Sequence, residues 1–217
     1  MQVTIDGVSV EVAPGTTILE AAGHAGAWIP TLCFDDRLDP FGACRVCLVG
    51  VEGAAHPLPA CTTVCREGMR VETGDATARR VAGAVVELVL SELPHPPGEH
   101  TELARVAARL QVSGPLRWTG ATHPVRHELE HPYLAFRHEL CISCGRCIRA
   151  CDEVQGAFAL SATGRGFEAN VGAGMDTGFL ESTCVSCGAC ADTCPTEAIS
   201  EHTLLELAGA VSAVPEA

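Results

Sequence analysis

The sequence CISCGRCIRAC at residues 141–151 returns, with the same cysteine spacing, as CVSCGACADTC at residues 184–194. Both runs have the form Cys-x2-Cys-x2-Cys-x3-Cys, and together they hold eight of the 13 cysteines in this chain of 217 residues. One repeat of this kind is too short and too few for a solenoid. It indicates instead a module built from two related halves.

The cysteine spacing within each run is typical of proteins that bind [4Fe–4S] clusters. Three cysteines within seven residues can surround one cluster, and in two-cluster ferredoxins the fourth cysteine ligates the other cluster. We therefore predict two [4Fe–4S] clusters with crossed ligands. The first would be held by Cys141, Cys144, Cys147 and Cys194, and the second by Cys151, Cys184, Cys187 and Cys190.

The residues around these cysteines fit this assignment with one departure. Gly145 and Gly188 lie inside tight loops, where a residue free to adopt positive φ lets backbone N–H groups turn toward sulfur. Pro195 follows the last cysteine as in the bacterial motif, whereas Asp152 follows Cys151, so the first run is the less typical one. Structural zinc usually uses cysteine pairs separated by a longer loop, and a thioredoxin-like Cys-x-x-Cys site needs a βαβ context that is missing here.

A second group of cysteines, nearer the N-terminus, is spaced Cys-x10-Cys-x2-Cys-x13-Cys. Four thiolates on one loop and one following strand suit a [2Fe–2S] cluster, although the plant-type pattern begins Cys-x4-Cys-x2-Cys and has a shorter first loop. Gly42 and Ala43 give the backbone close access to such a cluster. Cys65 is an alternative to Cys61 as the last ligand, but a lone buried cysteine is also a common small core residue, and we favour Cys61. The predicted ligands are Cys33, Cys44, Cys47 and Cys61.

The sequence around this group predicts a compact module. Apolar residues alternate over residues 3–12 around an Asp6-Gly7 turn, which is typical of a β-hairpin. A helix is expected to begin after Gly15-Thr16-Thr17 and to end near Gly26.

Two further helices are predicted in the middle of the chain. Residues 76–92 form an amphipathic pattern that the Pro-rich segment 94–98 would stop. Thr101 would cap a second helix, ended by Gly114-Pro115 and followed by an irregular connection.

The predicted fold class is therefore α+β. We expect a β-grasp [2Fe–2S] ferredoxin-like domain at residues 1–75 and a helical and irregular linker at residues 76–135. A bacterial-type 2[4Fe–4S] ferredoxin-like domain would follow at residues 136–205, with a C-terminal tail at residues 206–217.

The composition restricts the cellular compartment and the classes of partner that we expect. The cysteine content would suit a secreted disulfide scaffold, but the N-terminus shows no basic segment followed by an apolar one, so we expect a reducing, cytoplasmic setting. The longest apolar stretch, residues 81–90, is about half of what a membrane span needs. Because of that length, no membrane span is expected. A formal charge of −13 would repel phosphate backbones and anionic lipid surfaces, so neither a nucleic acid partner nor a membrane-surface role is expected.

Four segments carry a resemblance to a known family: IPTLC at 29–33, GACRVCLV at 42–49, PACTT at 59–63 and EGM at 67–69. They resemble the N-terminal iron–sulfur region of NAD-dependent molybdenum or tungsten formate dehydrogenase large subunits. The same region is shared by the diaphorase iron–sulfur subunit of NAD-reducing hydrogenases, by iron-only hydrogenases and by the complex I subunit that carries several clusters. The resemblance implies that Cys61 is the last [2Fe–2S] ligand and that Cys65 is not a ligand.

Within this superfamily the chain most resembles formate dehydrogenase, through CGRCIRACDEVQG at 144–156, GRGF at 164–167 and CVSCGAC at 184–190. Two departures matter. The family usually has a His-Cys-Cys-Cys site for a further [4Fe–4S] cluster, but residues 91–110 contain His95 and His100 and no cysteine, so we expect that cluster to be absent. The chain ends before any molybdopterin-binding domain, so we expect catalysis to reside in another polypeptide.

Three histidines, His123, His127 and His131, recur every four residues and would share one helical face. Pro124 and Pro132 oppose one continuous helix there. Surface or packing roles are favoured over a metal site, because no acidic or cysteine cluster accompanies these histidines.

The leading functional hypothesis is an electron-transfer subunit between a molybdopterin catalytic subunit and a flavin subunit that reacts with NAD. One alternative replaces the catalytic partner with a hydrogenase. Another is a freely diffusing ferredoxin, whose acidic surface would suit transient docking. Catalysis by this chain alone is disfavoured, because it has no Gly-rich nucleotide loop and no nucleophile with a neighbouring base.

Overall fold

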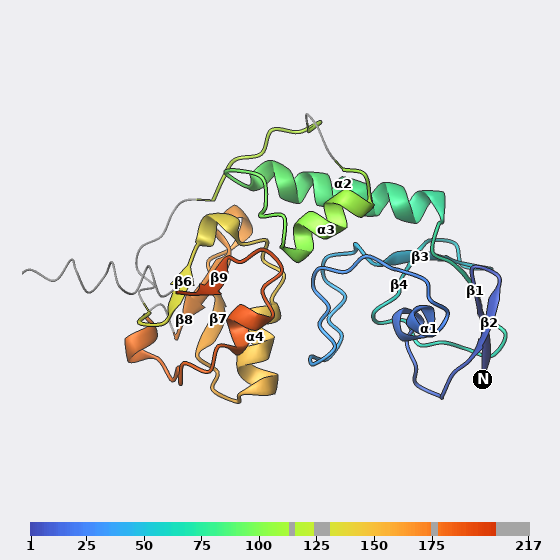
Figure 1. Ribbon diagram of the computed structural model, residues 1–217, viewed down its shortest axis with the longest axis horizontal. Coiled ribbons are helices and arrows are strands. Elements are labelled where there is room, and N and C mark those ends of the chain that lie inside the picture. Colours follow the sequence, from blue (N-terminus) through green and yellow to red (C-terminus); the bar gives the residue numbers. More distant parts are fainter. Residues whose placement is uncertain (113–115, 124–130, 175–177, 203–217) are drawn as a thin grey trace, which may run out of the picture. The chain divides into compact units, whose positions relative to one another are not determined.

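The computed structural model describes residues 1–112, 116–123, 131–174 and 178–202 (Figure 1). The chain divides into two compact units, Met1–Thr122 (unit 1) and His123–Ala217 (unit 2). Each unit is built around its own apolar core and its own group of cysteines.

Unit 1 contains a mixed sheet of five strands in the order β2-β1-β5-β3-β4. Strand β1 pairs antiparallel with β2 through the predicted hairpin and parallel with β5, while β3 pairs antiparallel with both β5 and β4. This arrangement confirms the predicted α+β fold with a β-grasp module. The strands are β1 (Gln2–Ile5), β2 (Val8–Glu11), β3 (Leu48–Val51), β4 (Leu58–Pro59) and β5 (Arg70–Glu72).

Helix α1 (Ile18–His24) supplies the other half of this core. The hydroxyl of Thr17 accepts the Glu20 N–H, and the Glu20 carboxylate accepts the Thr17 N–H at 2.7 Å, which closes a capping box. With its first turn fixed in this way, α1 buries one apolar face against the side chains of β1.

Helices α2 (Ala76–Glu92) and α3 (Glu102–Arg109) also belong to unit 1. Their N-caps are Asp75 and Thr101, and Thr101 is the cap that the sequence predicts. Helix α3 ends earlier than the sequence suggests, because Gln111 takes a left-handed conformation with φ of +58°. Gly114 and Pro115, the predicted stop signal, lie outside the described residues.

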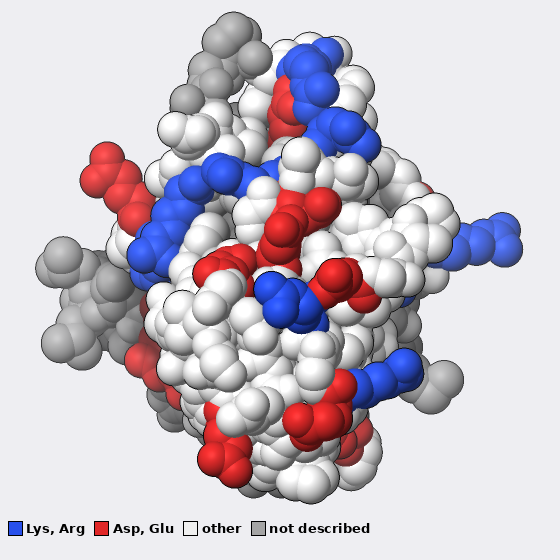
Figure 2. Space-filling view, turned by 90° about the vertical axis from the view of Figure 1, so that its right-hand side faces the viewer, with Lys and Arg blue, Asp and Glu red and all other residues white. Residues whose placement is uncertain are grey.

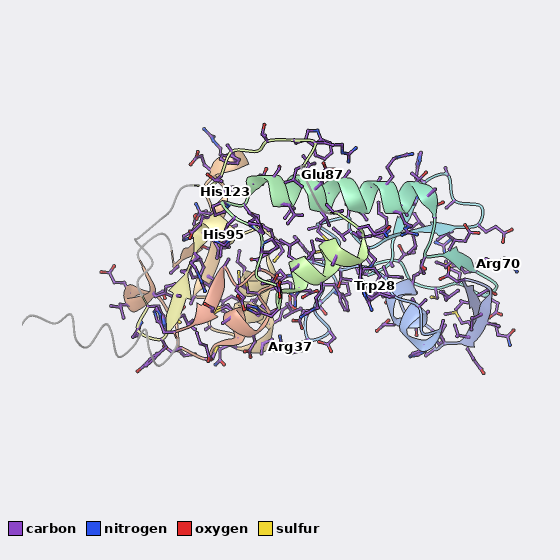
Figure 3. All side chains as sticks on the ribbon, turned by 45° about the horizontal axis from the view of Figure 1, so that its top comes forward. Trp28, Arg37, Arg70, Glu87, His95 and His123 are labelled. Atoms are coloured by element: carbon purple, nitrogen blue, oxygen red, sulfur yellow. The ribbon has the colours of Figure 1, made fainter. Side chains whose placement is uncertain are left out.

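The chain after α3 is anchored back onto α2. Glu87 is the labelled carboxylate on α2 in Figure 3. Arg117 donates its backbone N–H and its Nε–H to this buried carboxylate, at 2.5 and 2.7 Å. Gly120 donates to the Ser91 carbonyl, and a Cβ at this position would stand 2.6 Å from that oxygen. The guanidinium of Arg109 covers the Trp28 ring at 4.6 Å, so α3 is also held on the loop after α1.

Unit 2 combines two short antiparallel sheets with single-turn helices. Strand β6 (Leu134–Phe136) pairs with β9 (Ile199–Glu201), and β7 (Leu160–Thr163) pairs with β8 (Asn170–Ala173). Helix α4 (Arg146–Arg149) runs into a π-helical turn, η2 (Ala150–Val154), and α5 (Ala189–Asp192) is its counterpart in the second run. The 3-10 turns are η1 (His138–Leu140), η3 (Gly166–Glu168) and η4 (Phe179–Glu181).

Two properties of the surface and helices bear on partners. On the face shown in Figure 2, acidic and basic side chains are interspersed, so the excess of acidic residues does not form one patch there. Among the described residues, no helix is both long enough and apolar enough to cross a bilayer.

Candidate iron–sulfur sites

The four cysteines of the first group meet in unit 1. Cys33, Cys44 and Cys47 come from the long loop between α1 and β3, and Cys61 comes from the turn after β4. The N–H of Cys44 donates to Cys33 Sγ at 3.4 Å, and the Sγ atoms of Cys47 and Cys61 are 3.3 Å apart. The backbone also joins the two segments, because the Ala60 N–H donates to the Cys47 carbonyl at 3.0 Å.

Crowding of these thiols opposes their simultaneous ionisation. The hydrogen bond between Cys47 and Cys61 lowers the pKa of Cys47 to about 7, and the same bond, together with burial, raises the pKa of Cys61. The hydrogen bond with Cys33 and burial raise the pKa of Cys44. Four thiolates therefore require compensating positive charge, which is what bound iron supplies.

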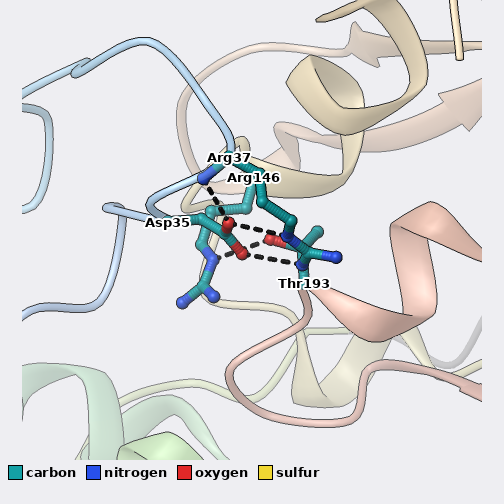
Figure 4. A network of polar contacts seen from close by, with 4 residues as sticks. All are labelled: Asp35, Arg37, Arg146 and Thr193. Atoms are coloured by element: carbon teal, nitrogen blue, oxygen red, sulfur yellow. Dashed lines mark hydrogen bonds and ion pairs between the residues drawn. The ribbon is translucent and has the colours of Figure 1, made fainter. Parts of the chain in front are cut away.

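The loop that carries Cys33 and Cys44 is held in shape by local contacts. Arg37 donates to the buried carboxylate of Asp35 through its backbone N–H, its Nε–H and its terminal N–H, at 3.0, 3.0 and 2.9 Å (Figure 4). Gly42 has φ of +66°, and a Cβ there would stand 3.0 Å from Thr62 Cγ2, beside Cys61. Gly42 therefore lets the loop pass close to the segment that carries Cys61.

Cys65 occupies a different place. Its thiol is buried among the core residues of unit 1, and its N–H donates to the Thr16 carbonyl at 2.8 Å. Burial, and then the charge of Glu20, raise the pKa of Cys65. Of the two candidates for the last position, Cys61 is therefore the one whose sulfur lies beside Cys47.

The cysteines of unit 2 act electrostatically on one another across the two runs, mainly within the two groups that the spacing predicts. Burial raises the pKa of Cys144 to about 12, and the thiolates that add to this effect are those of Cys194 and Cys141. Burial likewise raises the pKa of Cys190 to about 12, with additions from Cys187, Cys184 and Cys151. In each group the fourth cysteine comes from the opposite run.

Backbone donors reach the first cysteine of each run. The Ser143 N–H donates to Cys141 Sγ and the Ser186 N–H donates to Cys184 Sγ, both at 3.4 Å. The predicted positive φ of Gly145 and Gly188 is confirmed, at +74° and +78°. Sequence reasoning did not foresee that Ser143 and Ser186 also have positive φ, at +51° and +57°.

A buried pair joins the two runs. Arg146 on α4 is 6% exposed, and its Nε–H donates to the hydroxyl of Thr193, which is 1% exposed, at 3.0 Å (Figure 4). Within the described ranges, no three His, Cys, Asp or Glu side chains converge as the ligands of one metal ion do. Ligands of a multi-iron cluster bind different iron atoms and stand farther apart than the ligands of one ion.

The histidines singled out in the sequence have separate surroundings. His123, labelled in Figure 3, stacks on Phe167 with ring centroids 4.5 Å apart. His127 lies outside the described residues. His131 is buried beside Cys184, with Nε2 3.7 Å from Sγ. Burial, and then His202, lower the pKa of His131. His95 is exposed, and its Nδ1 lies 2.9 Å from the Pro96 carbonyl oxygen.

Comparisons with known proteins identify both modules. The model of a 2Fe-2S iron-sulfur cluster binding domain matches residues 1–76, and that of a 4Fe-4S dicluster domain matches residues 140–198. The chain is 34% identical over 208 residues to an NADH-quinone oxidoreductase component of Rhizobium meliloti, covering 92% of this chain and 24% of that protein. It is 32% identical over 173 residues to the alpha subunit of the NADPH-Fe(3+) oxidoreductase of Geobacter sulfurreducens, covering 76% of this chain and 20% of that protein.

A solved structure extends the likeness to three dimensions. NAD+-reducing [NiFe]-hydrogenase in the H2-reduced state contains a chain with a TM-score of 0.82 and 28% identity, and the match covers 94% of this chain and 88% of that one. This chain spans only 24% and 20% of the two curated relatives named above, so those proteins are much longer. The protein therefore joins an N-terminal 2Fe-2S ferredoxin-like domain to a C-terminal 4Fe-4S dicluster domain, and it is similar over most of its length to subunits of NADH- and NADPH-linked oxidoreductases.

Proposed function

We propose that this chain is an iron–sulfur electron-transfer subunit that binds one [2Fe–2S] and two [4Fe–4S] clusters. The observation that carries the proposal is that all 13 cysteines lie inside the two matching domains, five within residues 1–76 and eight within residues 140–198. When bound, such clusters supply one-electron oxidation and reduction. The chain's own residues supply thiolates, burial and N–H donors toward sulfur.

The ligand assignment rests on which thiols lie together. The 3.3 Å contact between Cys47 and Cys61 supports Cys61 over Cys65 as the last ligand of the [2Fe–2S] site. The grouping of Cys194 with Cys141 and Cys144 supports crossed ligation in unit 2. The proposed sets are Cys33, Cys44, Cys47 and Cys61; Cys141, Cys144, Cys147 and Cys194; and Cys151, Cys184, Cys187 and Cys190.

The subunit works inside a cytoplasmic complex. Its relatives are named as parts of oxidoreductases that use NADH or NADPH, which supports a partner subunit that binds flavin and reacts with the nicotinamide. The chain would pass electrons one at a time between that subunit and a catalytic subunit. A stable complex also fits helices α2 and α3, which a simple shuttle does not need.

Two kinds of catalytic partner are proposed. A molybdopterin subunit of the formate dehydrogenase type is supported by the resemblance carried by residues 144–156 and 164–167. A hydrogenase is supported equally by the TM-score of 0.82 with the NAD+-reducing [NiFe]-hydrogenase chain.

Affinity purification of the tagged full chain from its native cells under anaerobic conditions tests this function. We expect a flavin subunit and one catalytic subunit to copurify, and the purified assembly to reduce NAD+ with either formate or H2. Formate-dependent reduction selects the molybdopterin partner and H2-dependent reduction selects the hydrogenase. Recovery of an iron-loaded monomer that exchanges electrons with unrelated enzymes would overturn the complex in favour of a free ferredoxin.

A further inference from the structure

The imidazole of His131 lies against the first cysteine of the second run. Its Nε2 is 3.7 Å from Cys184 Sγ and 3.3 Å from Ser186 Oγ. The side chain belongs to the interior, because His131 is 7% exposed. This places a ring nitrogen within hydrogen-bonding distance of a predicted cluster ligand.

The backbone fixes which ring nitrogen carries the proton. Nδ1 of His131 accepts the N–H groups of Tyr133 and Leu134, at 3.1 and 3.0 Å. A nitrogen that accepts hydrogen bonds cannot carry the proton in the neutral ring, so the proton sits on Nε2. The donor therefore points toward Cys184 and Ser186.

Aromatic contacts hold the ring in this orientation. The Phe179 ring meets His131 edge to face, with centroids 5.0 Å apart and planes at 81°, and Tyr133 packs at 6.0 Å and 65°. Phe179 is itself 3% exposed and packs against Phe136 at 5.5 Å. The imidazole thus has little freedom to swing away from the sulfur.

We propose that His131 is a positioning residue whose Nε2–H donates to the Cys184 thiolate and raises the reduction potential of the [4Fe–4S] cluster held by Cys151, Cys184, Cys187 and Cys190. This inference rests on the proposed function, which puts that cluster there. When bound, the cluster would accept one electron from dithionite in the titration described below, and the proton would stay on Nε2. Hydrogen bonds to ligand sulfur favour the more negative, reduced state.

The backbone N–H donors to the first cysteine are equivalent in the two runs. The effect of the His131 ring can therefore be measured separately from theirs. Ser143 and Ser186 donate to Cys141 and Cys184 at the same distance of 3.4 Å. The contribution of His131 is therefore measured as a difference between variants at position 131, with the other [4Fe–4S] cluster as the internal reference.

The test compares two substitutions in the full chain, by anaerobic redox titration with dithionite followed by EPR. In His131→Asn, the side-chain oxygen replaces Nδ1 as acceptor for Tyr133 and Leu134, but the amide is too short to reach Sγ. In His131→Gln, the longer amide can again place an N–H donor near Cys184. The pair separates the donor role from the structural role of the ring.

We expect His131→Asn to disfavour reduction of one [4Fe–4S] cluster by at least tenfold, which corresponds to a fall of about 59 mV in its midpoint potential. The other [4Fe–4S] cluster and the [2Fe–2S] cluster should keep their potentials, and His131→Gln should recover most of the shift. Unchanged potentials in His131→Asn, or equal shifts of both [4Fe–4S] clusters, would overturn the inference.

Two further outcomes are decisive. If His131→Asn loses iron, the result for His131→Gln decides. A reduction equilibrium constant within about threefold of the wild-type value supports the donor role, and a constant about tenfold lower contradicts it. If the wild-type chain itself shows no reducible [4Fe–4S] clusters, the proposed function fails together with this inference. A full set of clusters with no effect at position 131 overturns the inference alone.

Discussion

Cys61 and Cys65 are four residues apart, yet their thiols serve different parts of unit 1. The Cys61 sulfur lies 3.3 Å from that of Cys47, in the set of four thiols that resists full ionisation. The Cys65 sulfur lies in the apolar core, where the added electrostatic effect comes from Glu20. Position in the fold, rather than residue type, separates the proposed ligand Cys61 from the packing residue Cys65.

This difference predicts the outcome of two matched substitutions. Cys61→Ser should lose the [2Fe–2S] cluster, about two of about ten irons per chain, because a ligand is removed. Cys65→Ser should keep the full iron content. Iron and sulfide analysis, with the EPR signal of the reduced [2Fe–2S] centre, distinguishes the two. Loss of that signal in Cys65→Ser, and its survival in Cys61→Ser, would reverse the assignment.

Crossed ligation makes a second prediction for unit 2. Cys194→Ser should damage the cluster held by Cys141, Cys144 and Cys147, although Cys194 belongs to the other run. Cys151→Ser is the matched control and should damage the second cluster. EPR redox titration of both variants resolves which [4Fe–4S] signal is lost. Selective loss of the second cluster in Cys194→Ser would contradict crossed ligation.

Some elements of the fold can be predicted from local sequence and others cannot. Residues 76–92 form α2 as predicted, and Thr101 caps α3, because periodicity and capping act within one or two turns. The pairing of β3 with β5 joins residues about 20 apart in sequence, such as Gly50 with Glu72, and nothing in either segment alone specifies it. The end of α3 at Arg109 escapes prediction because left-handed Gln111 is an uncommon stop signal.

The same distinction between local and long-range determinants applies to the proposed sites. Cysteine spacing suffices to propose all 12 ligands, because loop length restricts which thiols can share a cluster. The contact of His131 with Cys184 spans 53 residues and depends on the β6–β9 pairing and the aromatic packing around it. A histidine followed by Pro-Tyr carries no local signal of such a contact.

Helix α1 offers a test at the scale of one element. Removing its N-cap with Thr17→Ala should cost about 1 kcal/mol, because the Glu20 N–H loses its acceptor. Native-state hydrogen exchange should then be about fivefold faster for amides in α1. Thr16→Ala is the control, since Thr16 contributes its backbone carbonyl to Cys65 and this bond remains.

The contribution of the capping box to the stability of α1 also depends on pH. Hydrogen bonds from Thr17 lower the pKa of Glu20 in the folded chain. Its contribution to α1 is therefore fully present above the unfolded value of 4.5 and is lost as pH falls through the folded value. Equal exchange rates of wild type and Thr17→Ala at neutral pH would show that the box does not stabilise α1.

At the scale of the whole molecule, two units with separate cores carry all the proposed ligands. The segment between Cys65 and Cys141 contains no cysteine, and it includes the region where the resembling family has a further cluster. We therefore expect three clusters and about ten irons in this chain, not four clusters and about fourteen.

The most direct test of this central claim is Mössbauer spectroscopy of the full chain, purified anaerobically with 57Fe, alongside total iron and sulfide. We expect about ten irons per chain, with about one fifth of the absorption from a [2Fe–2S] cluster and about four fifths from [4Fe–4S] clusters. Stoichiometric zinc in place of iron, or about fourteen irons with an added [4Fe–4S] component, would contradict it.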